Sequence, residues 1–259
     1  MPRPLKLKML STAAIAALMI LAGSPAAMAQ QVQPLSPSSR TQKAAARAAV
    51  EGRYMFLLFY KQNDNATKAM ARTLNEGLAA RAGQAFLASV NANDPAEQAL
   101  VAKYEVGRAP MPITLAIAPN GAVTGVFTQR ITAESIEGAF VTPTMMFAMK
   151  SLQEGKLVLV SVEGTSQSPS PAAVREFCAD PHFKGRLTVT SVRASDPREA
   201  KFLNRMQLNP AEKTTNTLLL APPGVVVGKF GPSASKNDIA AALFKAGKCC
   251  DDPNCRLKK

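Results

Sequence analysis

The sequence predicts an α/β protein in which a mixed β-sheet flanked by helices occurs twice in tandem. Three observations favour this class. The 259-residue chain is 47% hydrophobic, which supplies enough apolar mass for real cores and excludes a wholly disordered or collagen-like chain. Several segments recur in the same order at one spacing. Short apolar runs alternate with amphipathic stretches, as expected for strands joined by helices.

The internal repeat is the most informative of these features. EGR before YMFLLFY, at 51–60, recurs as EGK before LVLVSV, at 154–162. SVNANDPAE recurs as SVRASDPRE, and TLAIAPNGAVTGVF as TLLLAPPGVVVGKF, each after about 103 residues. A unit of this length is a domain in its own right, since solenoid repeats are roughly 20–50 residues long. We therefore place one domain at 40–142 and a second at 143–247.

The N-terminal segment, 1–29, has the pattern of a secretory signal. A basic start precedes an apolar stretch, and Ala-Met-Ala precedes Gln30. The stretch is shorter than the roughly 20 residues that span a bilayer. We expect a secreted or periplasmic protein with no membrane span after cleavage, although a buried N-terminal helix is an alternative. Residues 30–39 (QQVQPLSPSS) are expected to form a flexible leader, and 248–259 a basic, cysteine-containing tail.

The first unit should fold in the order helix, strand, helix, strand, helix, hairpin, helix. A helix at about 40–50 leads to a strand at 54–60. The next helix carries apolar residues at the spacing of one helical face, namely Ala66, Met70, Leu74 and Leu78. A strand at about 85–90 and a helix opened by Asp-Pro-x-Glu follow. The chain then turns at Asn120-Gly121, and a last helix carries Ile136 and Phe140.

The second unit repeats this order. Its first helix is expected at about 143–152 and its strands at 157–162 and 187–192. Its hairpin turns at Pro223-Gly224, and its last helix carries Ile239 and Leu243. In both units the Asp-Pro-x-Glu segment predicts an N-cap aspartate, and a glutamate that completes a capping box; the residues are Asp94 with Glu97, and Asp196 with Glu199.

A family resemblance rests on two segments of the first unit. After the first strand, FYKQNDNATKAM at 59–70 matches without a gap the stretch F-[YW]-A-x-W-C-x-x-C-K-x-M of thioredoxin-like proteins. Pro112-Ile113-Thr114, before an apolar strand and Asn-Gly, is similar to the cis-proline segment of that family. The chain thus resembles the thioredoxin-like superfamily over most of both units, as a tandem duplication that lacks the CxxC motif.

The resemblance implies a role for each matched position. Asp64 and Thr67 would occupy the two cysteine positions, and Pro112 would be the cis-proline, whose backbone in active members meets the substrate peptide. The second unit departs further: its loop EGTSQSPS has no cysteine, and Thr215 replaces the proline. Thiol–disulfide exchange needs an attacking thiolate and a resolving thiol. We therefore assign no catalytic residue and no cofactor, and expect Asp64 and Thr67 to cap a helix.

The four cysteines all lie in the second half, and an even number in an exported chain predicts two disulfides among Cys178, Cys249, Cys250 and Cys255. Adjacent residues are poor partners, so Cys178 would pair with Cys249 or Cys250, and Cys255 with the other. Two alternatives stay open. One is a metal site formed by Cys178, His182 and the three tail thiolates. The other is a redox-active or intermolecular thiol.

The remaining chemistry is sparse. The net charge of +13 is spread along the chain, and no basic-aromatic motif predicts specific nucleic-acid binding. No phosphate-binding glycine loop or zinc-protease motif occurs. The sequence therefore predicts an exported, non-catalytic protein that binds a protein or peptide partner beside Pro112 or between the domains. The alternative is a thiol–disulfide or metal-handling accessory protein that uses the tail cysteines with Cys178.

Overall fold

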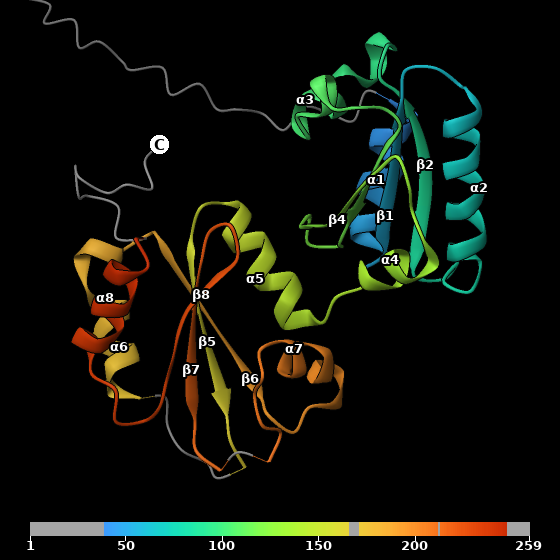
Figure 1. The fold of residues 1–259 in the computed structure, drawn as a ribbon. Coiled ribbons are helices and arrows are strands. Elements are labelled where there is room, and N and C mark those ends of the chain that lie inside the picture. Colours follow the sequence, from blue (N-terminus) through green and yellow to red (C-terminus); the bar gives the residue numbers. More distant parts are fainter. Residues whose placement is uncertain (1–38, 166–170, 212, 248–259) are drawn as a thin grey trace, which may run out of the picture. The chain divides into compact units, whose positions relative to one another are not determined.

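The computed structural model describes residues 39–165, 171–211 and 213–247. These residues form two four-stranded sheets with flanking helices (Figure 1). The predicted signal segment, most of the leader and the cysteine-containing tail lie outside the described residues. Ser39, which we placed at the end of the leader, is buried and is the N-cap of the first helix.

Each half of the chain contributes one set of elements in the predicted order. The first half forms α1 (Arg40–Val50), β1 (Tyr54–Tyr60), α2 (Asn65–Ala79), β2 (Ala85–Asn91), α3 (Gln98–Lys103), β3 (Ile113–Ile117), β4 (Val123–Thr128) and α4 (Ala133–Gly138). The second forms α5 (Pro143–Gln153), β5 (Leu157–Glu163), α6 (Ala172–Ala179), β6 (Leu187–Arg193), α7 (Ala200–Arg205), β7 (Asn216–Ala221), β8 (Val225–Phe230) and α8 (Lys236–Lys245).

The two sheets have one topology. The strand orders are β2-β1-β3-β4 and β6-β5-β7-β8. The first two strands of each half run parallel, because a helix joins them, and the closing hairpin adds two antiparallel pairings. This is the strand order and direction of a thioredoxin-like fold, so the predicted α/β class is confirmed.

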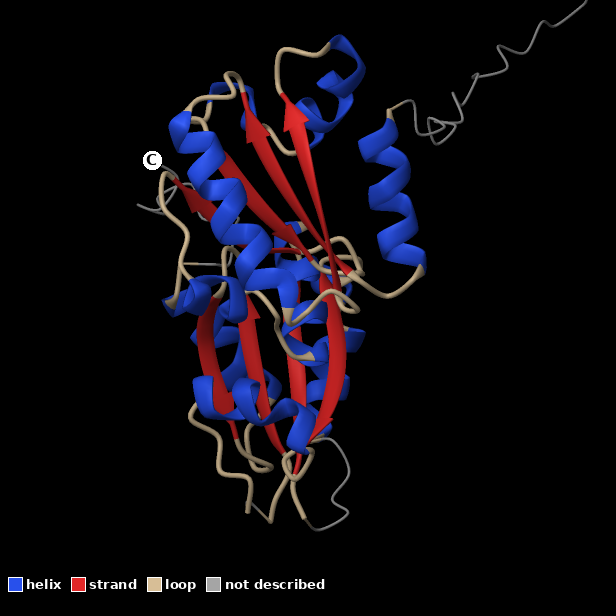
Figure 2. Cartoon of the chain, turned by 90° about the vertical axis from the view of Figure 1, so that its right-hand side faces the viewer, coloured by secondary structure: helices blue, strands red, loops and turns tan. Residues whose placement is uncertain are grey.

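Helices cover both faces of each sheet (Figure 2). The alternating side chains of β1 divide between two cores, as a strand with helices on either side requires. Phe56 and Leu58 pack with α2 and α4, whereas Leu57 and Phe59 pack with α1 and α3. In the second sheet one core joins β5 to α5 and α7, and the other joins it to α6 and α8.

The duplication extends to backbone detail. The bulge in the β3–β4 ladder lies between Ala116 and Ile117, and the bulge in the β7–β8 ladder lies between Leu219 and Leu220. Gly125 and Gly228 occupy matching positions, and a Cβ there would meet a phenylalanine ring two residues on at 2.5 and 2.7 Å. Equal registers and an equal bulge support the tandem duplication inferred from the sequence.

The predicted capping boxes do not form. Asp94 does cap its turn by accepting from Ala96 N, but Glu97 turns away and lies buried. Its two carboxylate oxygens accept hydrogen bonds of 2.9 Å from the hydroxyls of Ser39 and Thr41, at the start of α1. Charge-assisted bonds to two hydroxyls outweigh a single bond to the backbone of the glutamate's own turn.

The second unit repeats this contact with a different set of donors. Glu199 Oε1 accepts from the backbone N of Thr144 at 2.8 Å and from its hydroxyl at 2.9 Å. In both units the buried glutamate therefore holds the first helix against the segment before the third helix. The sequence prediction was wrong because it considered only partners within one turn of helix.

Replacing this glutamate should loosen the first helix. Glu97→Ala strands the hydroxyls of Ser39 and Thr41 in a buried site, and we expect a loss of about 2–3 kcal/mol in the free energy of unfolding. Urea unfolding, with hydrogen exchange of the α1 amides, measures both effects. The matched control is Glu76→Ala on the exposed face of α2. Equal stability of the two variants would contradict the assigned role.

Candidate functional site

The loop between β1 and α2 is closed by its own polar side chains. Asp64 is the N-cap of α2, and its Oδ1 accepts from the backbone N of Thr67 at 2.8 Å. Thr67 is buried, with 5% of the residue exposed. Its hydroxyl donates to the carbonyl oxygen of Gln62 at 2.9 Å. The helix therefore begins where the sequence predicts. Asp64 and Thr67, the two residues matched to the family's cysteines, both form hydrogen bonds that fix the start of the helix.

The electrostatics of this loop follow from the cap. The hydrogen bond from the Thr67 backbone lowers the pKa of the Asp64 carboxyl, since an acceptor bonded at a helix N-terminus is favoured in its charged form. Neither Asp64 nor Thr67 supplies the thiolate that attacks a disulfide. The loop can accept or donate hydrogen bonds, but as built it has no chemistry for thiol exchange.

The proline segment lies beside this loop because of the sheet register. β1 and β3 are antiparallel, with Phe59 opposite Ile113, so the residues after β1 meet those before β3. The Met111–Pro112 peptide bond is cis, and the Pro112 residue is buried. Behind it the Thr114 hydroxyl donates to Met70 Sδ of α2 at 3.2 Å. The segments holding Asp64 and Pro112 are thus brought to one end of the first sheet.

Met111 presents an open backbone at this edge. Within the residues that the structure describes, neither its N–H nor its carbonyl makes a hydrogen bond. A backbone donor and acceptor side by side can pair with an extended chain, as an added strand does. The sequence analysis named Pro112 and did not consider the backbone of the residue before it, for which the sequence carries no separate signal.

The corresponding place in the second unit is built differently. Gly164 stands at the position that matches Lys61, and a Cβ there would lie 2.5 Å from the carbonyl oxygen of Lys213. The segment before β7 carries the buried Thr215 and no proline. The backbone at Gly164 therefore lies against the backbone of Lys213, where the first unit has the side chain of Lys61. The second unit thus has no described edge that corresponds to the one at Met111.

Of the residues in the predicted cysteine sites, the structure describes Cys178 and His182. Cys178 lies on α6, partly buried in the core that faces α8, and burial raises the pKa of its thiol. His182 follows in a short turn, where its backbone N donates to Asp180 and its ring meets Phe183 edge-on. Cys249, Cys250 and Cys255 lie outside the described residues, and among those described no cluster of three metal-binding side chains exists. The disulfide, metal and redox hypotheses remain predictions.

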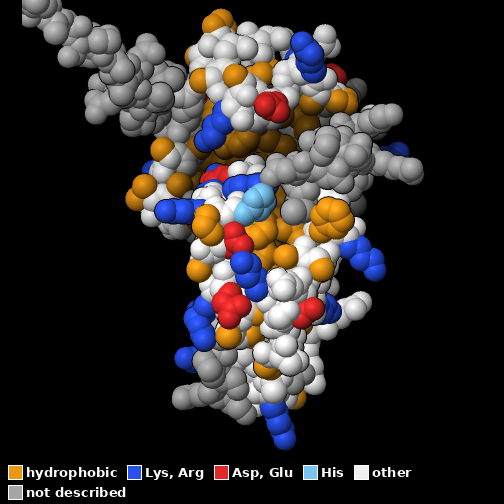
Figure 3. Space-filling view, turned by 90° about the vertical axis from the view of Figure 1, so that its left-hand side faces the viewer, with side chains coloured by type: hydrophobic (Ala, Val, Ile, Leu, Met, Phe, Trp, Pro, Cys, Tyr) orange, Lys and Arg blue, Asp and Glu red, His pale blue; other side chains and the backbone are white. Residues whose placement is uncertain are grey.

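The charged side chains do not gather on the face that Figure 3 shows. Lysines and arginines stand there singly among acidic, apolar and other polar groups.

Among the helices of the described ranges, none has both the length and the apolar character needed to cross a bilayer.

Both sheets therefore have a thioredoxin-like topology, and the loop after β1 of the first sheet carries Asp64 and Thr67. Among solved structures, the chain is similar to the first two thioredoxin domains of Saccharomyces cerevisiae Eps1p, with 13% identity, 83% of this chain and 98% of that chain covered, and a TM-score of 0.30. It is also similar to the zinc-bound form of human ERp44, with 10% identity, coverage of 81% and 60%, and a TM-score of 0.35. No family model and no curated protein matches the sequence.

The cap predicts an acid-sensitive start to α2. Because the pKa of Asp64 is lowered in the folded chain, its contribution to stability is complete above the ordinary aspartate pKa and is lost as pH falls through the lowered value. An NMR titration should show the Thr67 amide resonance moving with the Asp64 carboxyl. Asp64→Asn, which keeps an N-cap acceptor, should abolish that movement. A midpoint at or above that of an ordinary aspartate would contradict the cap.

Proposed function

We propose that this chain is an exported, non-catalytic thioredoxin-like protein that binds an extended segment of a protein partner along Met111 and Pro112. The open backbone of Met111 beside a thiol-free loop carries the proposal. Export rests on the signal-like N-terminal sequence alone.

The first argument concerns how a peptide would be held. An extended chain lying against Met111 can donate to its carbonyl and accept from its N–H, and the sheet behind is rigid because β1 and β3 are buried. Polar groups of the loop, including the exposed Asp64, lie at the same end of the sheet. Because backbone hydrogen bonds would supply the affinity, the peptide's side chains need few specific contacts. This mode of recognition suits a partner segment that is already extended.

The second argument concerns the residue at the start of α2, where thiol–disulfide exchange would need a thiol. An attacking thiol at the start of α2 would have its pKa lowered by the helix dipole. Here the position holds a carboxylate that cannot attack a disulfide. This supports binding without thiol exchange at this end of the first sheet.

Restoring the two cysteines tests whether the surrounding geometry is still that of a redox site. Asp64→Cys with Thr67→Cys should confer reduction of insulin disulfides by dithiothreitol-driven turnover, while the native chain stays at the uncatalysed rate. The matched control is Asp64→Ser with Thr67→Ser, which changes the same positions without adding thiols. A folded dicysteine variant that remains at the background rate would contradict a peptide site at Pro112.

A bulky side chain at the start of α2 tests binding directly. Peptides selected from a random library by the immobilised chain should lose at least about tenfold in affinity on Ala66→Trp, because the indole occupies the exposed start of α2. Ala79→Trp adds the same ring at the far end of the same helix and should leave affinity unchanged. Equal loss in both variants, or no selectable peptide, would overturn the proposal.

A further inference from the structure

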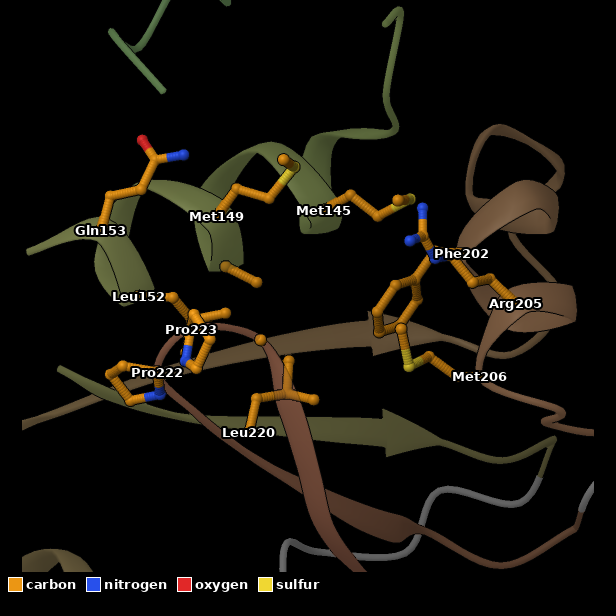
Figure 4. Close-up of a pocket in the computed structure, with 12 residues that line it drawn as sticks. Met145, Met149, Leu152, Gln153, Phe202, Arg205, Met206, Leu220, Pro222 and Pro223 are labelled. Atoms are coloured by element: carbon orange, nitrogen blue, oxygen red, sulfur yellow. The ribbon is translucent and has the colours of Figure 1, made fainter. Parts of the chain in front are cut away.

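A second candidate site lies in the other half of the chain, on the face of the second sheet that α5 and α7 cover. It is a cavity of about 390 Å³, within the roughly 300–1,000 Å³ typical of small-molecule sites. In Figure 4, α5 bounds it above, α7 at one side, β7 below, and the β7–β8 turn at the other side. Every residue that lines it belongs to 145–224, so the cavity is formed within this one unit.

The walls are apolar and adaptable. Met145 and Leu152 come from α5, Phe202 and Met206 from α7 and its end, and Leu220 from β7. Methionine side chains adjust to the shape of a flexible guest. A polypeptide in such a cavity would bury backbone amides against carbon and sulfur, which costs free energy unless each is paired. An alkyl chain carries no such groups.

One end of the cavity is charged. Among the described residues that line it, Arg205 alone carries a charge. Arg205 is an exposed residue whose guanidinium lies near Met145 at the α7 side of the cavity (Figure 4). Among the described residues, none forms a hydrogen bond or ion pair with this guanidinium. A guanidinium offers paired donors that match a carboxylate.

The first unit differs at the position that corresponds to Met206. There the residue at the end of α3 is Tyr104, whose ring meets Phe59 edge-on, with centres 6.3 Å apart. Lys103, the counterpart of Arg205, lies over that ring at 5.2 Å. The second unit has Val162 and Met206 at the positions of Phe59 and Tyr104. Neither of these two residues is aromatic in the second unit, although Phe202 stands where the first unit has Leu100, and Arg205 is not followed by a ring as Lys103 is.

From these contacts we propose that the second unit binds a single-chain aliphatic carboxylate, with the alkyl chain among Met145, Phe202, Met206 and Leu220 and the carboxylate at Arg205. This function is separate from peptide binding beside Pro112.

Titration of the full chain, labelled with ¹³C in its methionine methyl groups, tests this with decanoate as the probe, below its micelle concentration. Decanoate should shift the Met145 and Met206 methyl resonances saturably. Decanol should bind about tenfold more weakly, since it lacks the charge-assisted bond, and decylammonium more weakly still. Arg205→Ala should reduce decanoate affinity to that of decanol, whereas Lys103→Ala, the matched change in the first unit, should leave it unchanged.

A second variant tests the cavity itself. Met206→Tyr restores the ring of the first unit and should abolish binding of both decanoate and decanol. The proposal is overturned if decanoate causes no saturable shift at Met145 and Met206, if decylammonium binds as well as decanoate, or if Arg205→Ala binds decanoate like the native chain. None of these readouts involves the backbone edge at Met111 and Pro112.

Discussion

The antiparallel register of β1 against β3 is the constraint on which the first site depends. β1 is buried along nearly its whole length, so its neighbours cannot slip without exposing one of the two cores it separates. With Phe59 opposite Ile113, the chain leaving β1 must pass the chain entering β3. The helix cap at Asp64 and the cis bond at Pro112 come together for this reason, although they are far apart in the sequence. Neither feature would form a site in a sheet shifted by one residue.

The same register in the second sheet gives a different result, because a few side chains differ. Gly164 permits a backbone approach that the Cβ of Lys61 would prevent at the corresponding position. Met206 lines the cavity at the position where the first unit has Tyr104, whose ring packs on Phe59. A duplicated scaffold therefore carries its two candidate sites at different places: at the end of the first sheet, and over one face of the second.

Much of the fold could be predicted from the sequence, because its signals are local or repeated. The strand at 54–60 is an unbroken apolar run, the face of α2 shows in the spacing of Met70, Leu74 and Leu78, and the repeat requires one topology twice. What was missed depends on contacts between distant segments. The carboxylate of Glu97 meets hydroxyls that lie 58 and 56 residues earlier, and no spacing rule connects them. The cavity beside Arg205 likewise joins side chains of α5, α7 and β7, which lie far apart in the sequence.

The start of α2 uses its backbone donors for structure. In a catalytic loop the N-terminus of α2 must stabilise a thiolate, so its backbone donors are needed for chemistry. Here Asp64 takes the donor at Thr67, and Thr67 in turn ties the helix to Gln62. The electrostatic potential of the helix start is thus used to hold the loop in place. The loop beside Met111 is therefore pre-organised, so the proposed peptide would not have to order it on docking.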